Sequence, residues 1–445
     1  MLKKYIEQLS HLSWISLMIS LPISKGVASV ALTALIVLGI AKLFTPQKPS
    51  NKFNYRPIWV LYSLFFAYII GCFYSTDIKQ AVTFLYRANG LWMSPLAVML
   101  HTQLIATHYR IYLKALIAGT IWACLVTLLL YAMPESRVIY YIEQSNGILS
   151  PYSNTANRLS FGLYSPFIDR LQFGNLIGIS ILAVVWLGGK IEARKQYIYA
   201  FCSLVILCIT HLFLGARAAQ LGTLLGLALL TSAVLVQRIQ QQLKNKVSKA
   251  FVVLATAIFV LLLTLFLTYM AYHFVEPVQM RYHQLQWEMD MFLNHDFKPA
   301  SYEHFTSLRR IVSWINSWTL IKQYPIMGVG TGDYYTELNR IYAADNLTLP
   351  LNSHSQYLQI WATVGLWGLL TFIASLLYWL YTLHQRADRW LFCFGGSILL
   401  LYGLVFLFDA VLLRQIDNMT FPAILGIIYT ITYQTNRPTQ TPSDV

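Results

Sequence analysis

Residues 356–380 read QYLQIWATVGLWGLLTFIASLLYWL, a run of 25 residues without a charged side chain. A helix needs about 20 apolar residues to cross the hydrocarbon core of a bilayer, which is roughly 30 Å thick. The run is therefore long enough for a membrane-spanning helix. Similar runs recur on both sides of it along the chain.

The composition points the same way. Of the 445 residues, 57% are hydrophobic and only 11% are charged, and the mean hydropathy is +0.53. A soluble domain is typically about 45–50% apolar and about 25% charged. The sequence therefore indicates an integral membrane protein and excludes soluble enzymes and nucleic-acid-binding proteins.

Apolar runs between charged or turn-rich breaks predict an all-α, polytopic membrane protein with about 12 transmembrane helices. The predicted spans are 9–24, 26–44, 58–74, 90–107, 111–133, 171–189, 197–213, 220–236, 250–272, 356–380, 390–410 and 418–434.

The distribution of charge predicts the orientation. With the N-terminus in the cytoplasm, the cytoplasmic pieces are 1–8, 42–57, 108–114, 190–196, 237–249, 384–389 and 435–445. These pieces hold 18 Lys and Arg against 4 Asp and Glu, whereas the rest of the chain holds 14 of each kind. Because basic residues concentrate in cytoplasmic loops, both termini are predicted to be cytoplasmic.

Three parts follow from this topology. Residues 1–272 hold spans one to nine, with a non-cytoplasmic segment near 134–170; residues 273–355 form a large, partly helical non-cytoplasmic loop; residues 356–445 hold spans ten to twelve and a short tail. The cytoplasmic loops contain no nucleotide-binding pattern, and neither Cys nor His shows metal-ligand spacing. Chemistry on the outer face, with a substrate activated beforehand and without cofactor or metal, is therefore expected.

Arg217 is the first candidate functional residue. It lies in a short break, Leu214-Gly-Ala-Arg-Ala-Ala219, between two predicted spans. An arginine near membrane depth is costly and usually faces a cavity or a partner. The alternative is an arginine that caps a helix or reaches the lipid headgroups.

The large loop supplies further cations. Residues 303–323 predict an amphipathic helix, whose apolar stripe runs from Phe305 to Trp318 and whose opposite face carries Arg310. Arg309 lies to one side of that face, and Arg281 is a weaker candidate earlier in the loop. The stripe is expected to lie on the membrane surface, although two ordinary solvated arginines would explain the same pattern.

Two short segments complete the set of candidates. Gly328, Gly330 and Gly332 alternate after the helix and could form a backbone nest for an anion, although most such runs are turns. His354 precedes span ten, and a neutral imidazole with a pKa near ~6.5 suits a general base. A purely structural histidine is the competing interpretation.

Three motifs resemble those of the bacterial O-antigen ligase family, which is broadly related to O-antigen polymerases. They are Gly215-Ala-Arg217-Ala, then Arg310-Ile-Val-Ser-Trp314 followed by Tyr324-Pro-Ile-Met-Gly-Val-Gly330, and Asn352-Ser-His354-Ser-Gln-Tyr-Leu-Gln359. The sequence departs from the family pattern at the alanines beside Arg217 and at Ser355, where the family has Asn.

The resemblance implies a glycosyltransferase of the inner membrane with a periplasmic active site. Its donor would be a glycan on undecaprenyl diphosphate, and its acceptor a hydroxyl of the lipid A–core oligosaccharide. His354 would be the general base, and Arg217, Arg310, Arg281 and Arg309 would hold the diphosphate. Membrane lipids, but no nucleic acid, metal or nucleotide, would be its other partners.

Alternative functions stay open from the sequence. An O-antigen polymerase or an O-linked oligosaccharyltransferase would use the same donor, and a transporter of lipid-linked glycans would share the helical fold. Few charges within the spans and polar mass on one side argue against a transporter.

Overall fold

The computed structural model describes residues 2–45, 53–133, 165–189, 194–242, 276–294, 306–344 and 352–435, together with five single residues between 258 and 273. Within these residues the secondary structure is entirely helical, with no β-strand. The predicted all-α fold is confirmed for this part of the chain.

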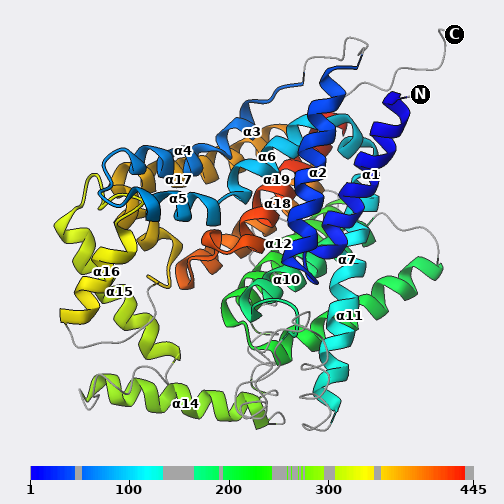
Figure 1. The fold of residues 1–445 in the computed structure, drawn as a ribbon. Helices are drawn as coiled ribbons and strands as arrows, with labels where there is room; N and C mark the ends of the chain where they lie inside the picture. Colours follow the sequence, from blue (N-terminus) through cyan, green and yellow to red (C-terminus); the bar gives the residue numbers. More distant parts are fainter. Residues whose placement is uncertain are drawn as a thin grey trace, which may run out of the picture.

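The helices follow one another along the chain (Figure 1). They are α1 (Leu2–Ser20), α2 (Lys25–Leu43), α3 (Arg56–Val60), α4 (Ser63–Cys72), α5 (Ile78–Arg87), α6 (Gly90–Leu100), α7 (Thr102–Ala132), α10 (Arg170–Gly188), α11 (Arg194–Leu214), α12 (Arg217–Gln242), α14 (Glu276–Leu293), α15 (Thr306–Gln323), α16 (Tyr334–Ala344), α17 (Gln356–Arg386), α18 (Arg389–Phe408), the 3₁₀ turn η3 (Val411–Leu413) and α19 (Gln415–Thr435).

Six helices in the described part of the chain are long and apolar enough to cross a membrane: α2, α7, α10, α11 (from Lys195), α17 and α18. The protein is therefore a multi-pass membrane protein. Apart from single residues, the predicted span 250–272 lies outside the described residues. The number of twelve spans stays a prediction.

One predicted boundary is wrong. A loop was expected at 108–114, but α7 continues through it as a single 31-residue helix. The chain breaks instead at His101, whose Nε2 lies 2.8 Å from the carbonyl oxygen of Leu35. Arg110 and Lys114 made the segment look like a loop, yet it contains no Pro or Gly, and long basic side chains can reach past an apolar helix surface.

The helices α10 and α19 form the centre of the bundle. Every residue from Gln172 to Val184 and from Ile416 to Thr432 is buried. A helix that is apolar on all sides is stable only when other helices surround it. The middle of α10 is consequently held in place by its neighbours, and Arg170 and Leu171 at its start lie directly before this buried part.

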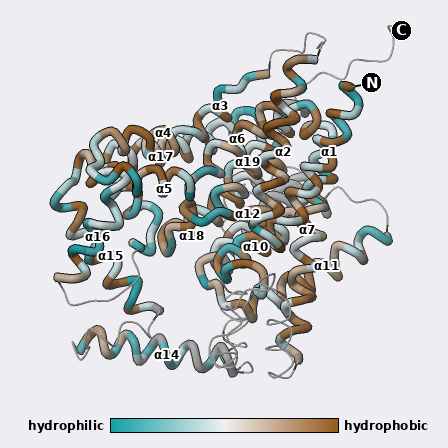
Figure 2. The backbone as a smooth tube through the Cα atoms, viewed as in Figure 1, coloured by the Kyte–Doolittle hydropathy of each residue, from teal (hydrophilic) through white to brown (hydrophobic). Residues whose placement is uncertain are grey.

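Helices α14 to α16 come from the predicted large loop, and their described parts are helical as expected. Figure 2 shows more hydrophilic residues along these helices than along α2, α4 and α17. Helix α14 lies apart from the main bundle, whereas α15 packs against α17 and α16 (Figure 1). This arrangement places α15 beside the ends of the bundle helices.

The orientation of α15 differs in part from the prediction. Ser313, Asn316 and Ser317 on its polar side are buried. Of the apolar stripe, Leu308 and Val312 are also buried, whereas Ile315 and Trp318 are exposed. The polar side therefore faces the protein, where Ser313 accepts a hydrogen bond of 2.8 Å from the Tyr342 hydroxyl of α16. Exposed apolar residues on the other side suit a surface in contact with lipid.

Candidate active site

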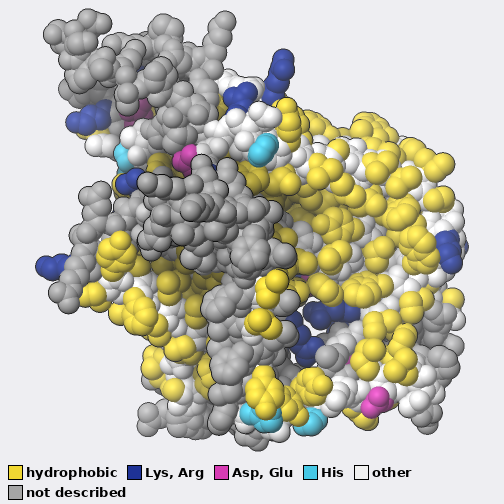
Figure 3. All heavy atoms as spheres, turned by 180° about the vertical axis from the view of Figure 1, so that it is seen from behind, with side chains coloured by type: hydrophobic (Ala, Val, Ile, Leu, Met, Phe, Trp, Pro, Cys, Tyr) yellow, Lys and Arg dark blue, Asp and Glu magenta, His cyan; other side chains and the backbone are white. Residues whose placement is uncertain are grey.

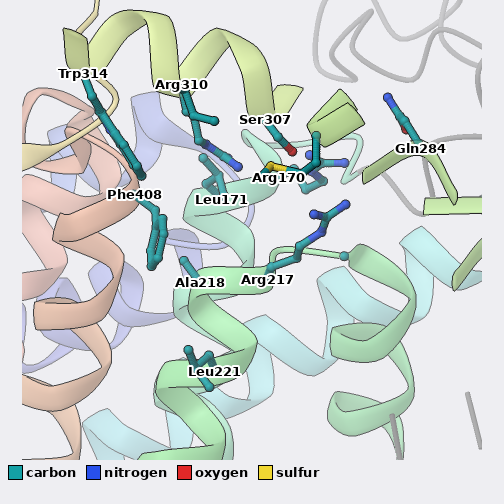
Figure 4. A pocket seen from close by; sticks show the side chains of 13 residues that line it. Arg170, Leu171, Arg217, Ala218, Leu221, Gln284, Ser307, Arg310, Trp314 and Phe408 are labelled. Atoms are coloured by element: carbon teal, nitrogen blue, oxygen red, sulfur yellow. The ribbon is translucent and has the colours of Figure 1, made fainter. Parts of the chain in front are cut away.

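A cavity of about 370 Å³ lies where α10 and α12 begin and α15 crosses above them (Figure 4). Three arginines and an apolar wall line it: Arg170, Arg217 and Arg310, with Leu171, Ala218, Leu221 and Phe408. The space-filling view shows a group of basic side chains in a hollow of a largely apolar face (Figure 3). Such a site can accept an anionic group that is attached to an apolar chain.

Arg217 is directed into the cavity by a tight turn. Gly215 adopts a φ of 65°, which a residue with a side chain rarely tolerates, and Arg217 is then the first residue of α12. The side chain of Gln220 donates to the carbonyl oxygen of His211 at 2.6 Å and so ties α12 to the end of α11. The prediction that Arg217 faces a cavity is confirmed.

Close packing explains one alanine of the turn. Ala216 is buried, and a Cβ built at Gly174 of α10 would approach the Ala216 Cβ to 2.6 Å. The turn and α10 thus touch almost backbone to backbone. A residue larger than Gly at 174 would displace the turn that carries Arg217.

Arg310 enters the same cavity from α15, so two arginines separated by 93 positions meet (Figure 4). Burial lowers the pKa of Arg310, Asp409 raises it, and the neighbouring Arg170 and Arg217 lower it. Its Nε is buried without a hydrogen-bond partner among the described residues. Buried, mutually repelling cations are stable when an anion joins them.

Glu288 holds the beginning of α15 over the cavity. Its carboxylate accepts from the backbone N–H groups of Ser307 at 2.8 Å and Leu308 at 3.4 Å. An acid at a helix N-terminus satisfies free donors and complements the helix dipole. The buried Glu288 thus positions α15 from α14, a role that the sequence analysis missed.

Arg170 was also missed. It begins α10 directly after Asp169, and its side chain lines the cavity together with Arg217 (Figure 4). The signal in the sequence was a cation at the start of an apolar run on the predicted outer side. The same signal occurs at many span boundaries, so it does not single out a functional residue.

His354 adjoins the cavity but is not among the residues that line it. Its backbone has a φ of 45°, which costs a non-glycine residue about 1–3 kcal/mol. Two contacts hold it there: its carbonyl oxygen accepts from the Trp314 indole at 3.0 Å, and its N–H donates to the Asn352 side chain at 3.3 Å. Trp314 belongs to the cavity wall and connects His354 to the site.

The imidazole of His354 faces a carboxylate that the sequence analysis also missed. Its Nδ1 lies 3.8 Å from Oδ1 of Asp409, too far for a hydrogen bond but close enough for a strong electrostatic effect. Burial lowers the pKa of His354 to about 4; Asp409 raises it, and Arg310, Arg309 and Arg414 lower it. The ring is therefore neutral at neutral pH, mainly through burial, with like-charge repulsion as a further cause.

Asp409 is itself held by Arg414. The guanidinium of Arg414 donates to Oδ2 of Asp409 at 2.7 Å and also pairs with Asp169. Because Asp169 precedes Arg170, this chain of charges connects the start of α10 to the turn between α18 and α19. Only the folded chain brings Asp169, Asp409 and Arg414 together.

The structure separates Arg309 from the cavity-lining pair. Arg309 does not line the cavity; its charge adds to the effect of burial in lowering the pKa of His354. Arg281 belongs to α14, but its side chain lies outside the described residues. Its predicted contact with the diphosphate stays a prediction.

The glycine segment does not form an anion nest, so that interpretation is wrong. The N–H groups of Val329, Gly330 and Thr331 donate to the carbonyl oxygens of Ala362, Thr363 and Gly71, at 3.0, 2.9 and 3.2 Å. The N–H of Gly332 donates to Ser75 Oγ at 2.9 Å. The donors are used inside the protein, so the segment fixes α16 and α17 to α4.

These features define a class of protein. It is a multi-pass helical membrane protein in which arginines from α10, α12 and α15 line one cavity beside a neutral histidine. Among the residues that the structure describes, no group of three His, Cys, Asp or Glu side chains could hold a metal ion.

Residues 202–373 match the family described as O-antigen ligase. This match supports the resemblance seen in the three motifs, all of which lie within the matched segment. It contains Arg217, Arg310 and His354, whereas Arg170 and Asp409 lie outside it. The family comprises glycosyltransferase-like ligases and polymerases.

The chain is also similar to an uncharacterized protein of Haemophilus influenzae. The two are 22% identical over 253 residues, which make up 55% of this chain and 59% of the relative. The chain thus spans about three fifths of that protein's length in the match.

Proposed function

We propose that the protein transfers an O-antigen polysaccharide from undecaprenyl diphosphate to a hydroxyl of lipid A–core oligosaccharide. The observation that carries the proposal is the meeting of Arg170, Arg217 and Arg310 in one cavity with an apolar wall. A polyprenyl diphosphate has the matching chemistry, an anionic group joined to a long apolar chain.

The arginines act on the leaving group. Arg217 and Arg310 hold the diphosphate, and Arg170 adds a third positive charge at the same place. Guanidinium groups donate two parallel hydrogen bonds to phosphate oxygens and remain charged at all relevant pH values. They stabilise the charge that grows on the diphosphate as its bond to the sugar breaks. Arg281 and Arg309 were predicted to assist, and the geometry favours Arg310 over Arg309.

His354 acts on the acceptor. Its neutral ring takes the proton of the acceptor hydroxyl while that oxygen forms a bond to the anomeric carbon. The bond between the anomeric carbon and the diphosphate oxygen breaks, and undecaprenyl diphosphate leaves with the electron pair. Direct attack of this kind inverts the anomeric configuration.

Burial is the main cause of the low pKa of His354, and repulsion by the surrounding arginines lowers it further. A bound diphosphate neutralises these cations, which removes part of the repulsion and raises the pKa of His354. The ring therefore becomes a stronger base when the donor is present. Asp409 strengthens it further by favouring the protonated ring.

The decisive experiment is a reaction of purified protein with lipid-linked O-antigen and lipid A–core. We expect glycan on lipid A–core without added metal or nucleotide. Extension of the lipid-linked glycan without use of lipid A–core would instead identify a polymerase, and glycan on a protein acceptor an O-linked oligosaccharyltransferase. Movement of the donor across a liposome membrane, with no transfer, would identify a transporter.

A second experiment tests the side of the membrane. We propose that both termini are cytoplasmic and that the cavity opens to the periplasm of the inner membrane. A topology reporter fused after Lys246 should then read cytoplasmic, and one fused near Asn294 should read periplasmic. The reverse readings would contradict the orientation without affecting the reaction assay.

A further inference from the structure

A second cavity, of about 330 Å³, lies between α7, α10 and α11. Gly188 at the end of α10 and Gln196 near the start of α11 line it. The arginine cavity is lined instead by the first residue of α10, Arg170, and by Gly215 after α11. The two cavities therefore lie at opposite ends of α10 and α11, and the proposed function does not use the second one.

The second cavity combines two cations with an apolar wall. Arg110 and Lys114 lie four residues apart on α7, which places them on the same face of the helix. Among the described residues, neither forms an ion pair with a carboxylate within 4.0 Å. The apolar wall is formed by Ile117, Val184, Leu187 and Ala200.

Arg110 keeps donors for a ligand. Its Nε donates to the Tyr109 hydroxyl at 3.2 Å, and its guanidinium carbon lies 5.9 Å from the centre of that ring. A guanidinium has five N–H donors, so the others can bind an anion. Tyr109 thus orients the guanidinium without neutralising its charge.

We propose that this cavity binds an anionic phospholipid. The phosphate pairs with Arg110 and Lys114, and an acyl chain lies along Val184, Leu187 and Ala200. Basic pockets between transmembrane helices are suited to anionic lipid headgroups. A free phosphate ion would use the two cations but would gain nothing from the apolar wall, so the wall favours a lipid.

The test measures lipid retained by the delipidated protein after incubation with phosphatidylglycerol or phosphatidylcholine, by native mass spectrometry. We expect phosphatidylglycerol to be preferred. Each basic residue near an anionic lipid contributes roughly fivefold in affinity, so Arg110→Gln with Lys114→Gln should weaken retention about 25-fold. The matched control is Lys3→Gln with Lys4→Gln, which removes the same charge from the exposed start of α1 and should retain the lipid.

A second variant separates a lipid from a free anion. A Cβ at Gly188 meets no atom within 4 Å, so Gly188→Phe can place its ring in the cavity without a backbone clash. It should reduce retention of phosphatidylglycerol at least tenfold while leaving both cations in place. Titration with inorganic phosphate should give no saturable binding to either protein.

Two results would overturn the proposal. Unchanged preference for phosphatidylglycerol in the Arg110 and Lys114 double variant would show that the lipid binds elsewhere. Saturable binding of inorganic phosphate that Gly188→Phe leaves intact would show a simple anion site. Thermal unfolding of each variant in the same detergent checks that the helices remain assembled.

Discussion

Two segments beside α17 were candidate sites from the sequence, and the structure gives them different surroundings. The glycine segment, 328–332, uses its backbone donors on the carbonyl oxygens and side chains of neighbouring segments. The histidine segment, 352–355, presents a strained backbone and a buried imidazole Nδ1 without a hydrogen-bond partner among the described residues. Both contain residues that could bind or react.

The difference shows how hydrogen bonding can distinguish a structural segment from one that is available to a ligand or a reaction. A segment whose donors are all satisfied by the protein has none left for a ligand. A buried polar group without a partner costs free energy, and use by a ligand or a reaction is one reason for its retention. The comparison predicts that changes at the histidine segment and its arginines reduce activity, whereas changes at the glycine segment reduce stability.

The largest effect is expected at the arginine pair. Arg217→Ala or Arg310→Ala should lower the rate of ligation by at least about 10³-fold, because each removes a cation from the leaving diphosphate. Lysine should restore little, since an ammonium lacks the planar pair of donors. The rate of transfer to lipid A–core by purified protein measures both effects.

Arg309→Ala is the matched control for Arg310→Ala, because it removes the same charge from the adjacent position outside the cavity. The loss of rate for Arg309→Ala should stay below about tenfold, because Arg309 acts on the site only through its charge and does not line the cavity. Equal losses at the two positions, or near wild-type rates for both lysine variants, would show that the arginines supply only diffuse charge.

The next effect concerns His354. His354→Ala and His354→Gln should each slow transfer about 10²–10⁴-fold while donor binding stays nearly unchanged, because general-base assistance has that magnitude. Glutamine keeps a donor and an acceptor for the loop. Substantial turnover by purified His354→Gln would therefore rule out the base and leave a structural role.

A smaller effect is expected for Asp409→Asn, together with a change in pH dependence. The neutral ring is the active form, so the rate should fall as the pH drops through the pKa of His354, about 4 in the free protein. Asp409 raises this pKa. Its removal should weaken the base, slow transfer by roughly tenfold and move the acid limb of the pH–rate profile to lower pH.

The control for this prediction is the pH–rate profile of Glu337→Gln. Glu337 pairs with Arg340 at 2.9 Å on α16 and is not among the charges that shift the pKa of His354. The Glu337→Gln variant should keep the acid limb of the pH–rate profile at the wild-type pH. If Asp409→Asn slows transfer but leaves the acid limb at the same pH, Asp409 only holds Arg414 in place.

The smallest effect on chemistry is expected at the glycine segment. Gly328 has a φ of 69°, and a Cβ there would lie 2.6 Å from the carbonyl oxygen of Thr363. Gly328→Ala should lower the free energy of unfolding by about 1–3 kcal/mol, seen as a lower Tm in detergent. The transfer rate per folded molecule should remain close to wild type, and a loss comparable to that of His354→Ala would contradict the comparison.

The sequence by itself determined the class of protein and the three motif residues. High hydropathy and low charge require membrane helices, because the hydrophobic effect depends mainly on the local composition of the chain. Arg217, Arg310 and His354 stood out because charged or titratable groups near apolar runs are costly. The break at His101 escaped detection, since a helix can continue through basic residues and can stop without a Pro or Gly.

Only the tertiary structure decided which candidates act together. Asp409 lies 55 positions from His354 and Asp169 lies 245 from Arg414, and no local pattern connects such distant residues. The fold also showed that the glycine donors are already used and that Arg310, rather than Arg309, enters the cavity. The type of each residue determines the free-energy cost of burying it. The packing of helices that are distant in sequence determines which partners offset this cost.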